Sequence, residues 1–286
     1  MYCHALPPHA STLLLFALLA SNTLWAQLPA KSQNGYKLVW QDEFNHTGQP
    51  DTTKWRFENG FKRNQEAQWY QAENAHCAGG YLVITAKKEE KPNPNYKPDS
   101  KNWTTRDALI TYTSASVVMH KAHAFKFGKL EVRAKLDAQT GLWPAIWTLG
   151  VDGEWPSNGE VDLMEYYNGG ILANIAIADT GRHRAIWDGA FRHLDSLGGK
   201  AWADAFHIWT LEWDTDYMRI FVDGQLLNEI DLQHSINKTD GKNPFRQPHY
   251  VLLNLAMGGT KGGSLQNTSL PSQYLIDYVR IYQKKR

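Results

Sequence analysis

The chain has 286 residues, and 42% of them are hydrophobic, which is enough to bury the core of one large domain or of two small ones. Lysine and arginine total 30 against 29 acidic residues, and this net charge of +1 argues against nucleic acid or a heavily sulfated glycan as a partner. The 12 tryptophans and 13 tyrosines are unusual, and such rings either stack on sugar faces or fill a β-sandwich core.

The N-terminal segment, residues 1–26, has the features of a secretory signal peptide. Its apolar run, Thr12–Ala20, is too short to cross a bilayer, so no membrane span is expected. Leu24-Trp25-Ala26 is an acceptable cleavage site. We therefore expect a secreted or periplasmic protein, cleaved after Ala26, whose mature part, 27–286, is a single domain.

Short strands separated by turns are expected along the first half of this domain. Their β-branched and aromatic composition places them at Tyr36–Asn45, Tyr81–Ala86, Ala115–Met119 and Phe127–Leu136. The segment Lys87–Ser100 holds three prolines and seven charged residues, which predicts an exposed loop. The run Arg63–Ala75 is polar and aromatic, and residue type alone leaves a short helix or a loop open.

Three carboxylates lie in an otherwise apolar run within Gly141–Asn168 (GLWPAIWTLGVDGEWPSNGEVDLMEYYN), and the apolar residues around them predict a strand. Because side chains alternate along a strand, Glu160 and Asp162 point to one side. Regular alternation would send Glu165 into the core, where a carboxylate is costly. A β-bulge at residues 163–164 would return Glu165 to the side of the other two, and we expect one there.

This arrangement predicts acid–base chemistry on a glycosidic bond. Two glutamates leaning together across Asp162 can bring their carboxyl groups to about 5 Å, the separation expected of a retaining glycosidase. Crowding raises at least one of their pKa values, so that one group keeps a proton near neutral pH while the other is ionised. An acidic edge strand on a solvated surface is the alternative, but three tryptophans precede this strand within 20 residues.

Those tryptophans are candidates for sugar binding. Trp143 and Trp147 stand four residues apart, so an extended strand would put both rings on one face. Trp155 lies five residues before Glu160, in the segment that leads into the acidic strand. We expect the three rings to hold the reacting sugar, and the alternative is that they belong to the core.

The pattern Glu-x-Asp-x-x-Glu, preceded by WPAIW and WPSNG, resembles glycoside hydrolase family 16. The family's Trp-x-Asp-Glu-Phe opening recurs at residues 40–44, and the resemblance covers nearly all of residues 36–283. It implies an all-β, two-sheet antiparallel β-jelly-roll sandwich with a concave substrate cleft. It also implies a retaining mechanism in which Glu160 is the nucleophile, Asp162 is its hydrogen-bonding helper and Glu165 is the acid/base.

The resemblance also indicates substrate-binding residues outside the acidic strand. It favours a loop lining the cleft at Arg63–Ala75, with Asn64, Glu66 and Trp69 as contacts. The apolar run Ile171–Ile177 is expected to be the hairpin partner of the acidic strand, and Asn174 is its only strongly polar residue. The laminarinase branch of the family often carries a histidine on this strand. Asn254 sits in another apolar strand, and its partner is a sugar hydroxyl or a neighbouring loop.

The rest of the chain supports an all-β domain. Residues 178–205 are expected to be irregular. Strands are predicted at Phe206–Asp214, at Met218–Ile230 around an Asp-Gly turn, at Tyr250–Gly259 and at Tyr274–Tyr282. About a dozen strands with no long helical pattern predict two packed antiparallel sheets.

No cluster of histidine or cysteine predicts a catalytic metal, and no cofactor is expected for catalysis. The resemblance implies a structural calcium ion held by Glu43, the Gly80 carbonyl and Asp277. Salt bridges or solvent around the two acidic side chains are the alternative.

The expected function is that of a retaining endo-β-glycanase, a monomer with β-1,3-glucan as the default substrate. An endo-β-galactosidase acting on β-galactan or on galactose–N-acetylglucosamine repeats is the alternative, because the strand at Ile171–Ile177 carries no histidine. A non-catalytic, lectin-like jelly roll is an alternative of another class, and a transglycosylase using the same site also stays open.

Overall fold

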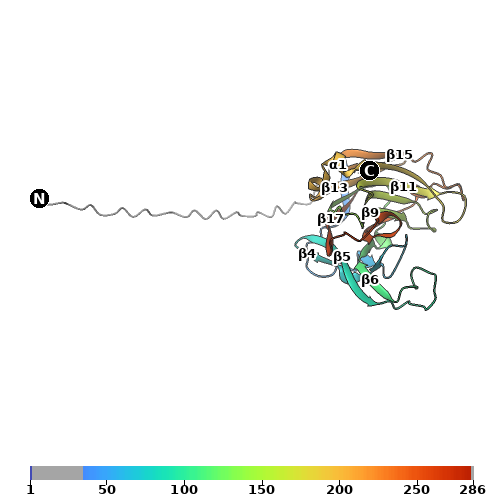
Figure 1. The fold of residues 1–286 in the computed structure, drawn as a ribbon. Coiled ribbons are helices and arrows are strands. Elements are labelled where there is room, and N and C mark those ends of the chain that lie inside the picture. Colours follow the sequence, from blue (N-terminus) through green and yellow to red (C-terminus); the bar gives the residue numbers. More distant parts are fainter. Residues whose placement is uncertain (2–34, 285–286) are drawn as a thin grey trace. The chain divides into compact units, whose positions relative to one another are not determined.

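A computed structural model describes Met1 and residues 35–284 of the chain, and the predicted signal peptide lies outside these residues apart from Met1. Residues 35–284 form two β-sheets (Figure 1). Neighbouring strands run antiparallel except β3 and β6, which are parallel. This architecture confirms the predicted two-sheet sandwich.

The first sheet has ten strands. Eight follow the order β15-β14-β13-β8-β17-β5-β6-β3, while β1 pairs with β17 and β4 with β5. The strands are β1 (Tyr36–Asp42), β3 (Gln68–Tyr70), β4 (Ala75–Ala78), β5 (Tyr81–Pro92), β6 (Leu109–Ser114), β8 (Gly128–Lys135), β13 (His207–Trp213), β14 (Tyr217–Val222), β15 (Gln225–Asp231) and β17 (Ser272–Lys284).

The second sheet carries the acidic strand and has the order β12-β11-β10-β9-β16-β7-β2. Its strands are β2 (Trp55–Phe57), β7 (Ser116–Met119), β9 (Leu142–Gly150), β10 (Glu160–Tyr167), β11 (Gly170–Ala178), β12 (Ala185–His193) and β16 (His249–Met257). β10 therefore lies between β9 and β11, and it is the predicted hairpin partner of β11.

Helices are short throughout the described part of the chain. They are α1 (Leu194–Leu197), α2 (Gly199–Ala203) and α3 (Gly259–Gly262), with 3-10 turns η1 (Ala72–Asn74), η2 (Lys121–His123) and η3 (Pro244–Arg246). Within the described residues, no helix has both the length and the apolar character needed to cross a bilayer.

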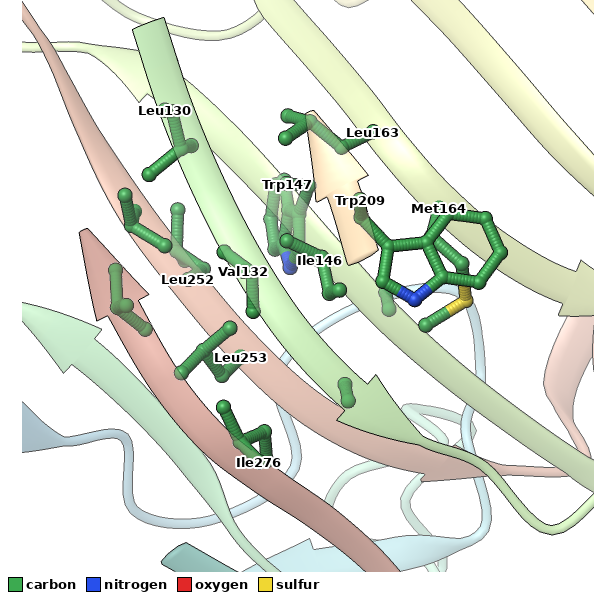
Figure 2. Close-up of a cluster of buried hydrophobic side chains, with 14 of the residues drawn as sticks. Leu130, Val132, Ile146, Trp147, Leu163, Met164, Trp209, Leu252, Leu253 and Ile276 are labelled. Atoms are coloured by element: carbon green, nitrogen blue, oxygen red, sulfur yellow. The ribbon is translucent and has the colours of Figure 1, made fainter. Parts of the chain in front are cut away.

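The core lies between the sheets and follows the alternation of their strands. From β8, Leu130 and Val132 point inward, as predicted, and meet Ile146 of β9 and Leu163 of β10 (Figure 2). All four are at most 1% exposed. Full burial of such a side chain stabilises the fold by about 1.5–3 kcal/mol. On β9 and β10, the same alternation leaves other residues on the outer face of the seven-stranded sheet.

Three predictions of local structure were wrong. The run Arg63–Ala75, expected to be a loop or a short helix, contains the strand β3 and the 3-10 turn η1. The section predicted to be irregular contains β12, which pairs with β11 over its whole length. β12 is an edge strand with most of its side chains exposed, so it lacks the buried apolar face that marks a strand in a sequence. The exposed loop predicted at Lys87–Ser100 also begins later than expected, because β5 continues through Lys87–Pro92 and pairs there with β6. Its charged side chains are tolerated because this end of the strand is largely exposed.

Candidate active site

The bulge in β10 is confirmed and decides where the acidic side chains point. Asp162 pairs with Trp147 of β9 and with Asn174 of β11, and the register of both ladders shifts directly after it. Glu165 then pairs with Ala145 and Leu172. One extra residue in the bulged strand thus puts Glu165 on the same outer face as Asp162.

Glu165 is held by one hydrogen bond on each carboxylate oxygen. Trp143 Nε1 donates to Oε1 at 2.8 Å, and Asn174 Nδ2 donates to Oε2 at 3.1 Å. Only 9% of the residue is exposed. Burial first, and the nearby Glu160 carboxylate second, raise the pKa of Glu165 to about 7, while the two donors oppose this rise. Glu165 is therefore a carboxyl group that holds a proton near neutral pH and also titrates there.

Glu160 is partly exposed and accepts a hydrogen bond on Oε2 from Trp155 Nε1. Burial raises the pKa of Glu160, and hydrogen bonds from Trp155 and Asp162 act in the opposite direction. Both glutamates accept two hydrogen bonds, but repulsion from a neighbouring carboxylate raises the pKa only at Glu165, so Glu160 is the more readily ionised of the two. An ionised carboxylate, which a nucleophile requires, therefore lies near a carboxyl group that keeps its proton, which an acid requires.

Asp162 lies between the two glutamates and is only 1% exposed. Burial, followed by repulsion from Glu165 and Glu160, raises the pKa of Asp162 well above its usual value. Its Oδ2 atom is buried without a hydrogen-bond partner in residues 35–284. A raised pKa favours the protonated form of Asp162, which donates a hydrogen bond to the Glu160 carboxylate.

A series of hydrogen bonds supports the sheet on the β16 side of Glu160, Asp162 and Glu165, the acidic trio. Trp147 Nε1 donates to Asn254 Oδ1 at 2.7 Å, and Asn254 Nδ2 donates to the Tyr70 hydroxyl at 3.1 Å. The Tyr70 hydroxyl in turn bonds to Glu66. Asn254 therefore has protein partners on both amide atoms, and both lie on strands, β9 and β3, rather than on the neighbouring loop that was expected.

Glu66 is the last residue in this series of hydrogen bonds and is itself buried. It accepts from Gln68 Nε2 at 2.8 Å and from Asn64 Nδ2 at 3.2 Å. Burial raises the pKa of Glu66. Asn64 is exposed, whereas Glu66 is only 3% exposed. The expected loop thus contributes a buried anchor and one exposed amide.

Trp69 makes no contact with the acidic trio in the described part of the chain. It lies on β3, in the ten-stranded sheet, and is 9% exposed. Its ring meets Phe61 edge to face at 5.4 Å between centroids and also packs against Gly60. These contacts are those of a packing residue, and a sugar contact for Trp69 stays a prediction.

Arg63 is a site residue that the sequence reasoning missed. Its guanidinium lies over the Trp147 ring, 5.1 Å from the centroid, and pairs with Glu58. Its Nη1 atom is buried without a hydrogen-bond partner in the described part of the chain. The run from Arg63 to Tyr70 was recognised, but nothing in the local sequence indicates that this arginine crosses to a ring 84 residues later.

The two acidic side chains among the predicted calcium ligands are each paired with an arginine. Arg280 donates to both oxygens of Glu43, at 2.8 Å each, and Arg133 donates to Asp277. Gly80 lies in the turn between β4 and β5. Among the described residues, no group of three or more His, Cys, Asp or Glu side chains is placed to hold a metal ion. Guanidinium groups on both carboxylates do not fit a bound cation, so the salt-bridged alternative describes this structure, and calcium binding stays untested.

The comparison with known proteins decides what kind of site this is. The family model of the glycosyl hydrolases family 16 matches residues 63–280, which is well over half of the chain. This chain belongs to glycoside hydrolase family 16. Membership makes it a glycoside hydrolase and confirms the resemblance drawn from the acidic strand.

Three relatives of this family 16 chain are informative. It is 31% identical to a β-glucanase of Rhodothermus marinus over 94% of this chain and 93% of that protein. It is 36% identical to a solved structure described with the endo-acting O-glycanases by which gut bacteria initiate mucin breakdown, with a TM-score of 0.80 over 90% of this chain and 94% of that one. The laminarinase catalytic domain of Thermotoga maritima is 31% identical, with a TM-score of 0.73 over 88% of this chain and 99% of that one.

The contact between Trp155 and Glu160 yields a first prediction. Replacing Trp155 with alanine removes a donor to Glu160 and one wall beside it, so we expect kcat/KM to fall by about tenfold to a hundredfold. The melting temperature should stay within about 3 °C of wild type, because this side chain is only partly buried.

Trp55→Ala is the matched control for this substitution. Trp55 is 1% exposed and far along the chain from the acidic strand, so its loss should destabilise the protein by about 3–5 kcal/mol. Steady-state kinetics and thermal melts of both variants separate the two roles. A Trp155 variant that melts as early as the Trp55 variant, with unchanged activity per folded molecule, would assign Trp155 to packing.

Proposed function

We propose that this family 16 glycoside hydrolase is a secreted or periplasmic, monomeric, retaining endo-β-glycanase with β-1,3-glucan as its default substrate. One observation carries the mechanism. The bulge in β10 gathers Glu160, Asp162 and Glu165 on one outer face and gives them different hydrogen-bond partners. Two carboxyl groups with different protonation states on one face are what double displacement at a sugar requires.

In the first step, Glu165 donates its proton to the oxygen of the leaving sugar. Its pKa of about 7 keeps it protonated for this at neutral pH. The Glu160 carboxylate attacks the anomeric carbon, and the glycosidic C–O bond breaks as the new bond forms. Asp162 donates a hydrogen bond to Glu160 and so lowers the basicity of the Glu160 carboxylate before the substrate binds.

In the second step, Glu165 is ionised and removes a proton from water. The water oxygen attacks the anomeric carbon, and Glu160 leaves as a carboxylate. Two displacements on the same carbon retain the β-configuration. Trp143 and Asn174 remain bonded to Glu165 in both protonation states, because each donates and neither needs the carboxyl proton.

The substrate proposal follows the relatives and has one rival. The β-glucanase of Rhodothermus marinus and the Thermotoga laminarinase support a β-glucan. The O-glycanase structure, with the higher TM-score, supports a mucin O-glycan, the kind of substrate that the endo-β-galactosidase alternative would cleave. The lack of histidine on the strand at Ile171–Ile177 is the specific feature that favours the rival, since laminarinases of the resembled branch often carry histidine on this strand. A lectin-like role would leave three crowded carboxyl groups without chemical use.

A glycan panel with product analysis tests this proposal. The mature chain is incubated with laminarin, β-galactan and mucin O-glycans, and mass spectrometry identifies the oligosaccharides released. Proton NMR in the first minutes then follows the anomer of the new reducing end. We expect internal cleavage with the β-anomer appearing first. An α-anomer appearing first would contradict double displacement, and binding without cleavage of any glycan would favour the lectin-like alternative.

A further inference from the structure

The pairing of β10, β11 and β12 aligns the acidic trio with the edge strand of the sheet. Glu160 pairs with Ala176, and Ala176 pairs with Trp187. In the row that holds Glu165, Leu172 pairs with Phe191. Because directly paired residues point to the same face of a sheet, Trp187 and Phe191 lie on the outer face that carries the trio.

Small residues keep this face open between the trio and the two rings. The row of Asp162 continues through Asn174 to Gly189, where a Cβ atom would overlap the Asn174 side-chain oxygen. Asn174 therefore extends over Gly189 while its nitrogen bonds to Glu165. Ala176 is the only residue between Glu160 and Trp187 in their row, so no bulky side chain separates the two.

Phe191 is positioned by a second glycine. A Cβ atom on Gly170 would overlap the Phe191 ring, so the ring lies over the backbone of β11. The edge of the ring also meets His193 at 6.0 Å between centroids. The ring is thus held against the sheet, with one side resting on the backbone and the other open.

The exposure of these rings is not explained by packing. Trp187 is 51% exposed and Phe191 is 44% exposed, and among residues 35–284 no other tryptophan is counted as exposed. The alternate residues of β12, Ile186 and Ala190, are the more buried ones and face inward. β12 thus partly buries Ile186 and Ala190 and presents its two large aromatic side chains to solvent, which is typical of a binding surface.

We propose that Trp187 and Phe191 form a second sugar-binding platform, on which the apolar faces of hexose units of a β-linked chain stack. The platform lies on the side of β10 opposite to Trp147 and Asn254, about 10 Å from the acidic strand at two strand spacings. A glycan bound across the strands would contact the trio and the platform together. The inference rests on the proposed function for the identity of its ligand.

The platform is tested with Trp187→Ala and Phe191→Ala, measured on laminarin, mucin O-glycans and short oligosaccharides cut from each. Tyr217→Ala is the matched control, because Tyr217 is 36% exposed but lies on β14 of the other sheet. We expect each platform variant to lose about tenfold in kcat/KM on the long chain. On the shortest substrate that is still cleaved, we expect less than about a twofold change, because that substrate does not reach β12.

A binding measurement separates this inference from the proposed function. Affinity electrophoresis in gels containing each polysaccharide compares wild type, the two platform variants and the control. Weaker retardation of the platform variants alone supports the platform, whether or not the glycan is cleaved. Unchanged retardation and unchanged kcat/KM on long chains would overturn it, even where wild type cleaves the glycan. Equal losses on short and long substrates would also overturn it, because they would mean damage to the trio.

Discussion

Replacing Glu160 with glutamine is expected to lower kcat by at least about a thousandfold on any glycan that the wild type cleaves. Glutamine keeps the size of the side chain and its contact with Trp155 but has no anionic oxygen to attack the anomeric carbon. Both displacements pass through this residue, so neither step survives. Initial rates at saturating substrate, together with melting curves, measure the effect.

Two further substitutions make that result specific. Asp162→Asn should lose less activity, because Asp162 tunes Glu160 without bonding to carbon. Glu212→Gln, a half-buried carboxylate on β13 of the other sheet, should keep wild-type activity. Near-normal hydrolysis by the Glu160 variant would end its assignment as nucleophile. A loss in Asp162→Asn as large as that in Glu160→Gln would mean that the nucleophile has been assigned to the wrong residue.

Replacing Glu165 with glutamine is expected to cause a loss of similar size on natural glycans but not on every substrate. The natural leaving group is an alkoxide that needs the Glu165 proton, whereas an aryl glycoside with an acidic phenol leaves without it. The first step on such an aryl substrate should therefore persist in the Glu165 variant and be absent in the Glu160 variant. A burst of phenol in stopped-flow absorbance distinguishes the two.

The pH dependence of the wild type follows from the same group. Glu165 must be protonated to act as the acid, and its pKa is raised to about 7. Activity should therefore fall as pH rises through about 7, and this basic limb of the profile should be missing from the residual activity of Glu165→Gln. A wild-type profile that stays flat to pH 9 would contradict the assignment.

Glu165 should also affect the stability of the fold. Its pKa is higher in the folded state than the usual value of about 4.3, so the folded state binds the proton more tightly. Below about pH 4 the group is protonated in both states, and its contribution is then fully present. The free energy of unfolding falls as pH rises from about 4 through 7. The free energy of unfolding of Glu165→Gln, taken relative to that of wild type, should therefore be higher at pH 8 than at pH 4, as measured by chemical denaturation. An equal difference at both pH values would mean that the folded pKa is not raised.

Local sequence was sufficient wherever a rule of alternation or a turn decides the structure. The bulge in β10 was predictable because regular alternation would have buried the carboxylate of Glu165, and one extra residue avoids that cost. The Asp223-Gly224 turn between β14 and β15 was predictable from its residue types. The shared face of Trp143 and Trp147 followed from their even spacing.

Edge strands and long-range partners could not be predicted in this way. β12 was missed because the rules for finding strands look for a buried apolar face, and its large aromatic residues are exposed. Asn254 and Trp147 are 107 residues apart, and Tyr70 is 184 residues from Asn254. The arginine partner of Glu43 is 237 residues away from it. No local pattern carries information about such pairs.

The sequence by itself therefore determined the family, the all-β class and the acidic trio, because these depend on residue type and on spacing within one strand. Only the tertiary structure decided which group holds each carboxyl, that Asn254 is bonded within the protein, and that two exposed rings of β12 stand in line with the trio. Those features depend on the register between strands, which is set by how the two sheets pack over the whole chain.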